Sequence, residues 1–306
     1  MSPSASGAPL GVSLTGHWLA LDAIQRLAQR ADELGYAVVL VDGDASLLPR
    51  RTAAPVYDPS VVATLTLAAT RRARVGSIRL PVFWNPLLLA RSLATLQEAS
   101  AGRALGFFGA GAGRHLGRVG LEPLTGRERV ARLDETLEVL RRLLAGESVT
   151  HHGPHIQLDG AFVRPPAQPL PLVVAAAGPQ TLRVVERHAD VWDANLPPLR
   201  ERLDPLRERL ARELETWIWI FTRPGASLDA AAKDYRRHCP WFSDVPERAL
   251  EQILLWGEPA RCREQLASLR ADLRVDLPVL DLVGLNESAA LHALEALAPA
   301  NGPNLS

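Results

Sequence analysis

Polar side chains that could exchange a proton with a substrate follow three of the apolar runs in this sequence. His17, Asp42 and Asn195 each come just after such a run, where a strand would end. Imidazole, carboxyl and amide groups can transfer protons or hydrogen-bond a small molecule. We predict these three residues as candidate catalytic groups. The alternative is that they line the pocket wall without taking part in the reaction. Asp42 and Asp44 would pair as carboxylates only if extended backbone continued there, and loop solvation is the other interpretation.

Aromatic residues gather at the same strand ends. Trp18, Trp84, Phe107 and Trp192 all lie at or near the end of an apolar run. Aromatic walls favour flat, conjugated ligands. We therefore predict that these four side chains line a substrate pocket; the alternative is that some of them belong to the core.

The segment 172–181 is typical of a phosphate-binding turn. An apolar run passes through Ala176, Ala177 and Gly178 into the start of a helix, where Thr181 adds a hydroxyl. Free N–H groups and the positive end of the helix dipole attract a phosphate, and small side chains let it approach closely. Ordinary strand-to-helix turns also use small residues, so this alternative stays open.

A glycine-rich stretch at residues 106–113 does not match the dinucleotide-binding motif. Counted from Gly109, the motif places its third glycine where this chain has Arg114. Gly109 and Gly111 instead predict a ligand lying close to the backbone.

Composition excludes several classes of protein. The 306 residues include 34 Lys and Arg against 34 Asp and Glu, which argues against a basic nucleic-acid-binding surface. Cys239 and Cys262 cannot form a disulfide framework, and a solvated turn is favoured over a metal site for the histidines of segment 151–155. We predict no metal. No apolar run reaches about 18 residues, so we expect a soluble, cytoplasmic protein without a membrane partner.

Short apolar runs alternate with segments of helical period, which predicts βα units around a parallel sheet. Eight strands with intervening helices favour one (β/α)8 TIM barrel over two small domains, so we expect residues 1–306 to form a single domain. A hairpin insertion is expected at 147–163. The expected strands are 10–14, 37–41, 74–80, 103–108, 172–176, 191–194, 216–221 and 278–283. The expected helices are 19–34, 58–69, 86–99, 128–144, 179–187, 199–214, 247–255, 259–271 and 287–297.

Several ordered segments resemble the bacterial luciferase-like flavin-dependent oxidoreductases, a superfamily that includes enzymes of the deazaflavin coenzyme F420. The run 100–103, Ser-Ala-Gly-Arg, is similar to the family's SxGR motif, and 188–192, His-Ala-Asp-Val-Trp, is similar to its "rhADgW" segment. The further matching segments are 69–77, 85–96, 109–111, 129–143, 175–187 and 256–269.

The resemblance implies a TIM barrel that holds FMN or F420 across the strand ends, with the cofactor phosphate at Ala177, Gly178 and Thr181. It also implies a bulge with a non-prolyl cis peptide after strand three, against which the flavin ring rests. The residues that match this bulge are Gly76, Ser77 and Ile78.

The sequence also departs from the family pattern. Where many members have a histidine after strand two, this chain has Asp42, Gly43 and Asp44, and Asn85 replaces another frequent histidine. The segment 222–246 is shorter than the family's usual insertion, which predicts a reduced lid over the pocket and a wetter site.

These observations lead to one main functional prediction and two alternatives. The main prediction is a monooxygenase that uses O2 and reduced FMN, supplied by a separate flavin reductase, on a small organic substrate. An F420-dependent reductase or dehydrogenase is the first alternative, favoured if Arg114, Arg118 and Arg183 form a groove for the acidic tail of F420. The second alternative is a non-catalytic flavin-binding barrel. The resemblance further implies a homo-oligomer.

Overall fold

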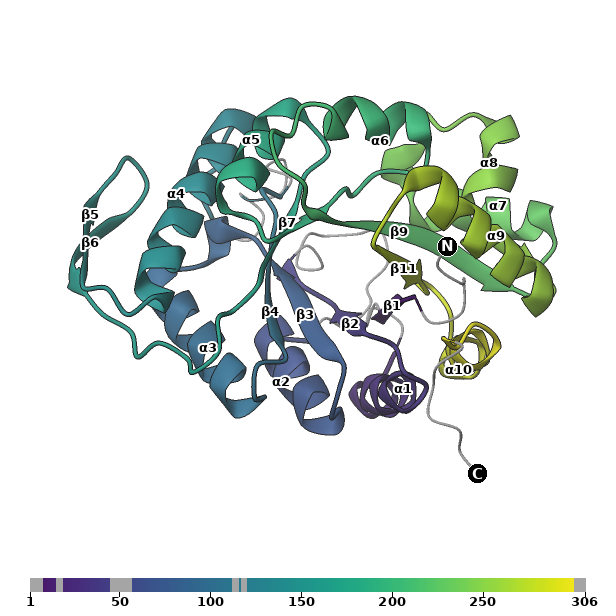
Figure 1. Ribbon diagram of the computed structural model, residues 1–306, viewed down its shortest axis with the longest axis horizontal. Helices are drawn as coiled ribbons and strands as arrows, with labels where there is room; N and C mark the ends of the chain where they lie inside the picture. Colours follow the sequence, from purple (N-terminus) through teal and green to yellow (C-terminus); the bar gives the residue numbers. More distant parts are fainter. Residues whose placement is uncertain (1–7, 15–18, 45–56, 112–115, 117–119, 300–306) are drawn as a thin grey trace, which may run out of the picture.

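A closed ring of eight parallel strands forms the centre of the molecule (Figure 1). The computed structural model describes residues 8–14, 19–44, 57–111, 116 and 120–299. Each strand pairs in parallel with the next, and β8 pairs with β9 to close the ring. The predicted (β/α)8 barrel is therefore confirmed. Its strands are β1 (Gly11–Leu14), β2 (Val38–Val41), β3 (Arg74–Arg79), β4 (Ala104–Phe108), β7 (Leu172–Ala175), β8 (Val191–Asp193), β9 (Glu215–Pro224) and β11 (Leu277–Asp281).

Helices surround this ring, and polar caps fix where several of them begin. Asp58 Oδ1 accepts the N–H groups of Ser60 and Val61 at the start of α2, and Asn85 caps α3 in the same way. Within the described part of the chain, no helix is long and apolar enough to cross a membrane. The helices are α1 (Leu21–Glu33), α2 (Pro59–Ala69), α3 (Pro86–Ala99), α4 (Gly126–Leu144), α5 (Pro179–His188), α6 (Arg200–Arg207), α7 (Leu228–His238), α8 (Glu247–Ile253), α9 (Pro259–Leu273) and α10 (Glu287–Ala296).

Each barrel strand is buried on both faces, which explains its nearly continuous apolar sequence. Alternate residues point inward and outward. The inward set forms one core cluster inside the barrel, with Leu40, Phe107, Val173, Trp217 and Val279 among its members. The outward set packs against the helices in a second, larger cluster. Because the inner cluster fills the ring, a ligand can enter only at the ends of the strands.

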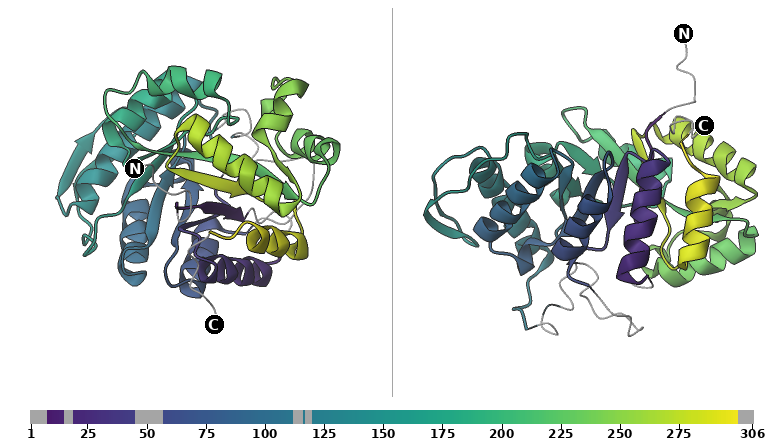
Figure 2. Two further views of the ribbon diagram at one scale, coloured as in Figure 1. Left: turned by 45° about the vertical axis from the view of Figure 1, so that its right-hand side comes forward. Right: turned by 90° about the horizontal axis from the view of Figure 1, so that it is seen from below.

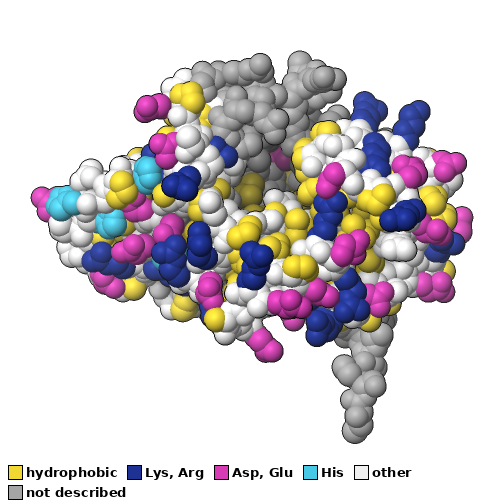
Figure 3. Space-filling view, turned by 90° about the horizontal axis from the view of Figure 1, so that it is seen from above, with side chains coloured by type: hydrophobic (Ala, Val, Ile, Leu, Met, Phe, Trp, Pro, Cys, Tyr) yellow, Lys and Arg dark blue, Asp and Glu magenta, His cyan; other side chains and the backbone are white. Residues whose placement is uncertain are grey.

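A two-stranded hairpin projects from α4 at one end of the molecule (Figure 1). It consists of β5 (Val149–His152) and β6 (Gln157–Ala161), as predicted from the sequence. The buried Glu135 carboxylate of α4 accepts the N–H groups of His155 and Ile156 and hydrogen-bonds His151. Histidine side chains gather at this end (Figure 3). The contacts of His151 and His155 with Glu135 hold the hairpin against α4.

The opposite end of the molecule carries an extension of the barrel wall (Figure 2). Strand β9 continues to Pro224, where β10 (Leu255–Gly257) pairs with it in parallel. With α7 and α8 they enclose a separate core that includes Phe221, Tyr235 and Leu250. The sequence analysis predicted α8 but not α7 or β10, and for residues 222–246 it expected a shortened lid.

The helix predicted at 199–214 is shorter than expected. It ends at Arg207, and the chain beyond it binds the end of α5. There the Ala211 N–H donates to Glu186 Oε1, and the Arg212 guanidinium donates to the Glu186 and Ala189 carbonyls. These contacts hold the segment after Arg207 against α5 in a non-helical conformation.

One buried carboxylate connects α1 to the loop that leads into β3. Asp32, 6% exposed, accepts the backbone N–H groups of Arg71, Arg72 and Ala73 at 2.9, 2.8 and 2.6 Å. These N–H groups come from the turn between α2 and β3. Asp32 therefore fixes where β3 begins. Because the strand has a set length, Asp32 also helps to position the carboxyl end of β3 in the barrel.

Replacing Asp32 with alanine leaves these three N–H groups without their acceptor. We expect Asp32→Ala to lower the free energy of unfolding by about 2–4 kcal/mol, because each donor loses a charge-assisted bond. Urea denaturation measures this loss. Asp22→Ala, on the exposed face of the same helix, is the matched control and should lower the free energy of unfolding much less, because solvent screens its ion pair with Arg26. Equal losses in the two variants would contradict the role of Asp32.

Candidate functional site

The carboxyl ends of the barrel strands form the candidate site, as is general for this fold. By the alternation along each strand, a set of polar and large apolar side chains stands at inward positions near these ends. It comprises Asp42, Ile78, Asp193, Trp219 and Asp281, and the smaller Ser13 and Ala175 are also inward. We call this set the mouth of the barrel. Asp42, Ile78, Trp219 and Asp281 are partly exposed, whereas Asp193 is buried. Carboxyl groups and the apolar side chains of Ile78 and Trp219 thus share one end of the barrel.

Asp193 is a buried carboxyl that has only neutral hydrogen-bond partners. It is 2% exposed at the end of β8. The Trp219 indole N–H donates to Oδ2 at 3.1 Å, and the Asn195 backbone N–H donates to Oδ1 at 3.0 Å. Burial raises the pKa of Asp193 to about 7, although both donors favour the charged form. A carboxyl with such a pKa can accept or donate a proton near neutral pH.

A second buried carboxyl, Asp44, lies behind the ends of β2 and β3. Its Oδ2 accepts the Leu80 N–H at 2.8 Å and the Trp84 indole N–H at 2.5 Å. The buried Arg79 guanidinium lies 4.0 Å from Oδ1 and 5.3 Å from the centre of the Trp84 ring. Burial raises the pKa of Asp44 and lowers that of Arg79. Asp44 thus holds the strand ends and Trp84 in place.

The predicted cis bulge after strand three is wrong. Among the described residues no peptide bond is cis, and Gly76, Ser77 and Ile78 continue β3 in register with β4. Ser77 Oγ donates to the Asp42 carbonyl at 2.5 Å. A Cβ on Gly43 would lie 2.2 Å from the Ile78 carbonyl oxygen, so only glycine lets β2 approach β3 this closely. Regular pairing on both sides accounts for the straight course of β3.

The start of α5 has the properties that a phosphate needs. Its N-cap is Gly178, which offers no side chain to the helix, and in the described residues the N–H groups of Gln180 and Thr181 meet no acceptor. A Cβ on Gly178 would have no atom within 4 Å. Ala177 is exposed, Ala176 is buried, and the Thr181 hydroxyl donates to the Gly178 carbonyl at 3.0 Å. Free donors beside open space fit a bound phosphate.

The two glycines predicted to approach a ligand have packing roles of their own. A Cβ on Gly109 would lie 3.1 Å from Ile78 Cδ1, and one on Gly111 would lie 2.8 Å from Leu80 Cδ1. Gly111 also has a φ of +69°, which favours glycine. Their cofactor role stays a prediction, because tight packing already explains both residues.

The predicted aromatic pocket does not form as expected. Trp192 is fully buried in the layer between strands and helices and donates its indole N–H to the Ala176 carbonyl at 2.9 Å, so its ring does not line the mouth. Phe107 is 2% exposed and belongs to the barrel interior, below the mouth. Trp84 is partly exposed and packs against the outer cluster. Trp18 lies outside the described residues.

Of the predicted catalytic residues, Asp42 stands at the mouth, Asn195 is exposed beside it with a φ of +45°, and His17 lies outside the described residues. The sequence analysis missed Asp193 and Trp219 as site residues. Alternation along each strand was the available signal. In the run 191–193, this alternation points the Asp193 side chain into the barrel and the Trp192 side chain toward the helices. In the run 216–221, it points Trp219 into the barrel.

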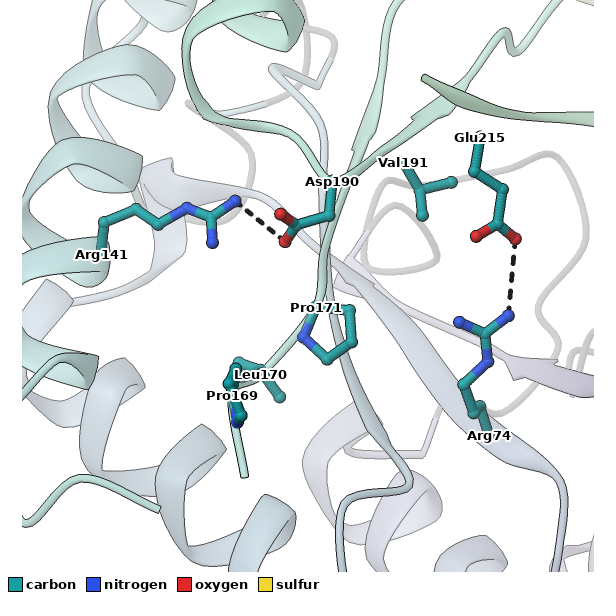
Figure 4. A pocket seen from close by; sticks show the side chains of 8 residues that line it. All are labelled: Arg74, Arg141, Pro169, Leu170, Pro171, Asp190, Val191 and Glu215. Atoms are coloured by element: carbon teal, nitrogen blue, oxygen red, sulfur yellow. Dashed lines mark hydrogen bonds and ion pairs between the residues drawn. The ribbon is translucent and has the colours of Figure 1, made fainter. Parts of the chain in front are cut away.

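The other end of the barrel holds a hollow of about 310 Å³ where the strands begin (Figure 4). Two ion pairs line it. Arg141 lies 2.9 Å from Asp190, and Arg74 lies 3.5 Å from Glu215, whose Oε1 also accepts the Trp217 indole N–H. Each charged group of the hollow therefore has a partner. Residues at this end of a TIM barrel generally serve stability, and we assign these pairs that role.

Within the described residues, no group of three or more His, Cys, Asp or Glu side chains could hold a metal ion. The histidines of the hairpin contact Glu135 and Gln157 instead.

The fold and sequence match known proteins. Among curated proteins, the F420-dependent glucose-6-phosphate dehydrogenase of Kineococcus radiotolerans is 29% identical over 233 residues, which cover 73% of this chain and 67% of the relative. For the four relatives compared, the aligned segment spans 50–67% of their length.

Solved structures with the same fold include two kinds of enzyme. An F420-dependent secondary alcohol dehydrogenase in complex with an F420–acetone adduct has a TM-score of 0.80 at 17% identity, covering 96% of this chain and 99% of that one. The monooxygenase RslO1 from Streptomyces bottropensis has a TM-score of 0.77 at 20% identity, covering 97% and 100%. The sequence model of the luciferase-like monooxygenase family matches residues 3–243. This chain therefore belongs to the luciferase-like monooxygenase family and is an oxidoreductase.

Proposed function

We propose that this protein is an F420-dependent oxidoreductase that moves a hydride between the cofactor and a small hydroxylated substrate. The observation that carries the proposal is the sequence similarity to F420-dependent glucose-6-phosphate dehydrogenases, at 29% identity over 73% of the chain. The main prediction from sequence, a monooxygenase using reduced FMN, is not confirmed. It remains the alternative that the first experiment below distinguishes.

The described residues fit such a cofactor in two places. The uncapped start of α5 offers N–H groups to a phosphate beside the open space at Gly178. Ile78 and Trp219 give the mouth apolar surface against which a flat ring can rest. Arg183 is exposed in the first half of α5 and adds positive charge for an acidic tail; Arg114 and Arg118 lie outside the described residues.

The chain's own contribution to the reaction is positioning and proton exchange. When bound, F420 supplies hydride chemistry. The closed, filled barrel keeps water away from the inner face of a ring at the mouth. Carboxyl groups at the mouth provide proton acceptors near the substrate. A separate flavin reductase would be needed only under the FMN alternative, and a homo-oligomer remains part of the proposal.

The first prediction from this proposed function concerns the choice of cofactor. We expect the purified protein to bind oxidised F420 with a Kd in the micromolar range or tighter, roughly −8 kcal/mol or more, and more tightly than it binds reduced or oxidised FMN. Fluorescence titration under anaerobic conditions measures all three. Preference for reduced FMN would favour the monooxygenase, and lack of binding by any of them would overturn the proposed function.

The second prediction tests the phosphate position. Gly178 has an extended backbone and no neighbour where a Cβ would stand, so Gly178→Glu should fold normally. Its carboxylate would repel a phosphate at the helix start, and we expect F420 affinity to fall roughly tenfold or more. Gln157→Glu, on the hairpin, is the control with the same change in charge and should bind as the wild type does. Unchanged affinity in Gly178→Glu would place the phosphate elsewhere.

A further inference from the structure

We propose that the Asp193 carboxyl is the catalytic group that takes the hydroxyl proton of the substrate during hydride transfer and returns it in the reverse reaction. This inference rests on the proposed function and adds to it the residue that handles the proton. It also defines the substrate class as an alcohol whose hydroxyl-bearing carbon carries a hydrogen, including the ring carbon of a sugar hemiacetal.

The first argument is the direction of the side chain. Val191, two residues earlier on β8, belongs to the cluster inside the barrel, and Trp192 between them belongs to the outer layer. Asp193 therefore points inward at the last position of its strand. Its register partner on β7 is Ala175, whose side chain is a single methyl group. On β9 the partly exposed Trp219 reaches it with its indole N–H.

The second argument is the charge balance around this carboxyl. Both recorded hydrogen bonds come from neutral donors, the Trp219 indole and the Asn195 backbone N–H. Among the described residues no Arg, Lys or His forms an ion pair with Asp193, whereas the buried Asp44 has Arg79 beside it and Asp32 accepts three N–H groups. A buried carboxylate without a counter-charge is costly, so a neutral form persists to unusually high pH. Such groups occur where proton transfer is needed.

The surroundings contain few other groups that could titrate in its place. From β7 the inward residues near Asp193 are alanines. On β9, Glu215 lies at the far end of the barrel in its pair with Arg74, and Arg223 is held by Asp234. Among the described residues, Asp42 just after β2 and Asp281 at the end of β11 are the other carboxyl groups at inward positions of the mouth. These two are the residues from which an experiment has to separate Asp193.

The proton and electron balance of the step is simple. The C–H bond of the alcohol breaks, and its electron pair leaves with the hydrogen as a hydride to the oxidised deazaflavin. The O–H bond breaks, its electron pair becomes the second bond of the carbonyl, and the proton forms a bond to an Asp193 oxygen. The substrate is oxidised by two electrons and the deazaflavin is reduced by two. Solvent later removes the proton from the carboxyl.

The first test needs no cofactor. The folded protein should carry one extra proton on Asp193 between the ordinary carboxyl value of 3.8 and about 7. The free energy of unfolding should therefore decrease as pH rises through this window, with a slope one proton steeper than in Asp193→Asn, and become parallel above it. A protonated carboxyl band in the infrared spectrum, titrating near neutral pH and absent from Asp193→Asn, would identify the group. If that band is missing in the wild type, the inference is overturned.

The second test uses the F420-loaded enzyme. Asp193→Asn should lower kcat by roughly 10²–10⁴-fold and remove the rise of kcat/KM with pH near neutrality, while F420 affinity stays within about threefold. Asp42→Asn and Asp281→Asn should keep that rise whatever their rates. Asp190→Asn, at the start of the same strand in the hollow of Figure 4, is the matched control and should keep both rate and pH profile.

Trp219→Phe separates proton transfer from a merely structural role. It removes one donor to the charged carboxylate, so the rise of kcat/KM should move to higher pH. If F420 binds and turns over but Asp193→Asn keeps the wild-type pH profile, only this inference fails. If the wild type binds no F420, the proposed function fails with it.

Discussion

Closure of the parallel barrel is the constraint on which the rest of the structure depends. Each short strand has neighbours on both sides, with β8 paired to β9 to complete the ring, so the ring leaves no free edge. A ring of this size is filled by its own side chains, and the inner cluster does fill it. Polar groups on inward faces can therefore exist only at the two ends, where water or a ligand reaches them.

The inward polar groups are stabilised differently at the two ends of the barrel. Where the strands begin, Arg74 pairs with Glu215 and Arg141 with Asp190, so the charges there neutralise one another. Where the strands end, Asp193 lies buried, and its hydrogen-bond donors among the described residues are neutral. The difference separates an end built for stability from an end at which a charge is costly. That cost is the reason to assign Asp193 a chemical role.

The sequence was sufficient for the barrel because each strand, being buried on both faces, appears as an apolar run followed by a helix with its own cap. It did not reveal α7 or β10, since an amphipathic helix and a three-residue strand on an outer edge leave little periodic signal. The uncapped start of α5 was foreseeable from Gly178 and its small neighbours, and its phosphate-binding role stays a prediction. Trp192 was misplaced because proximity to a strand end does not say which way a side chain points.

Direction, and not residue type, decides which groups reach the mouth. Asp193 stands next to Trp192, and only the alternation along β8 assigns the carboxyl to the inside and the indole to the outside. The shift in its pKa needs more than alternation, because it comes from the burial of the carboxyl, which only the packed structure reveals.

The same reasoning bears on the missing histidine after β2. Asp42, Gly43 and Asp44 occupy that place, and two of them have structural roles. Gly43 makes room for the Ile78 backbone, and Asp44 accepts hydrogen bonds from Leu80 and Trp84. An imidazole at position 44 would disrupt these contacts. In the catalytic role that we propose for Asp193, a group that titrates near neutral pH is supplied from β8, where burial raises the pKa of this carboxyl to about 7. Change of environment can thus take the place of a change of residue.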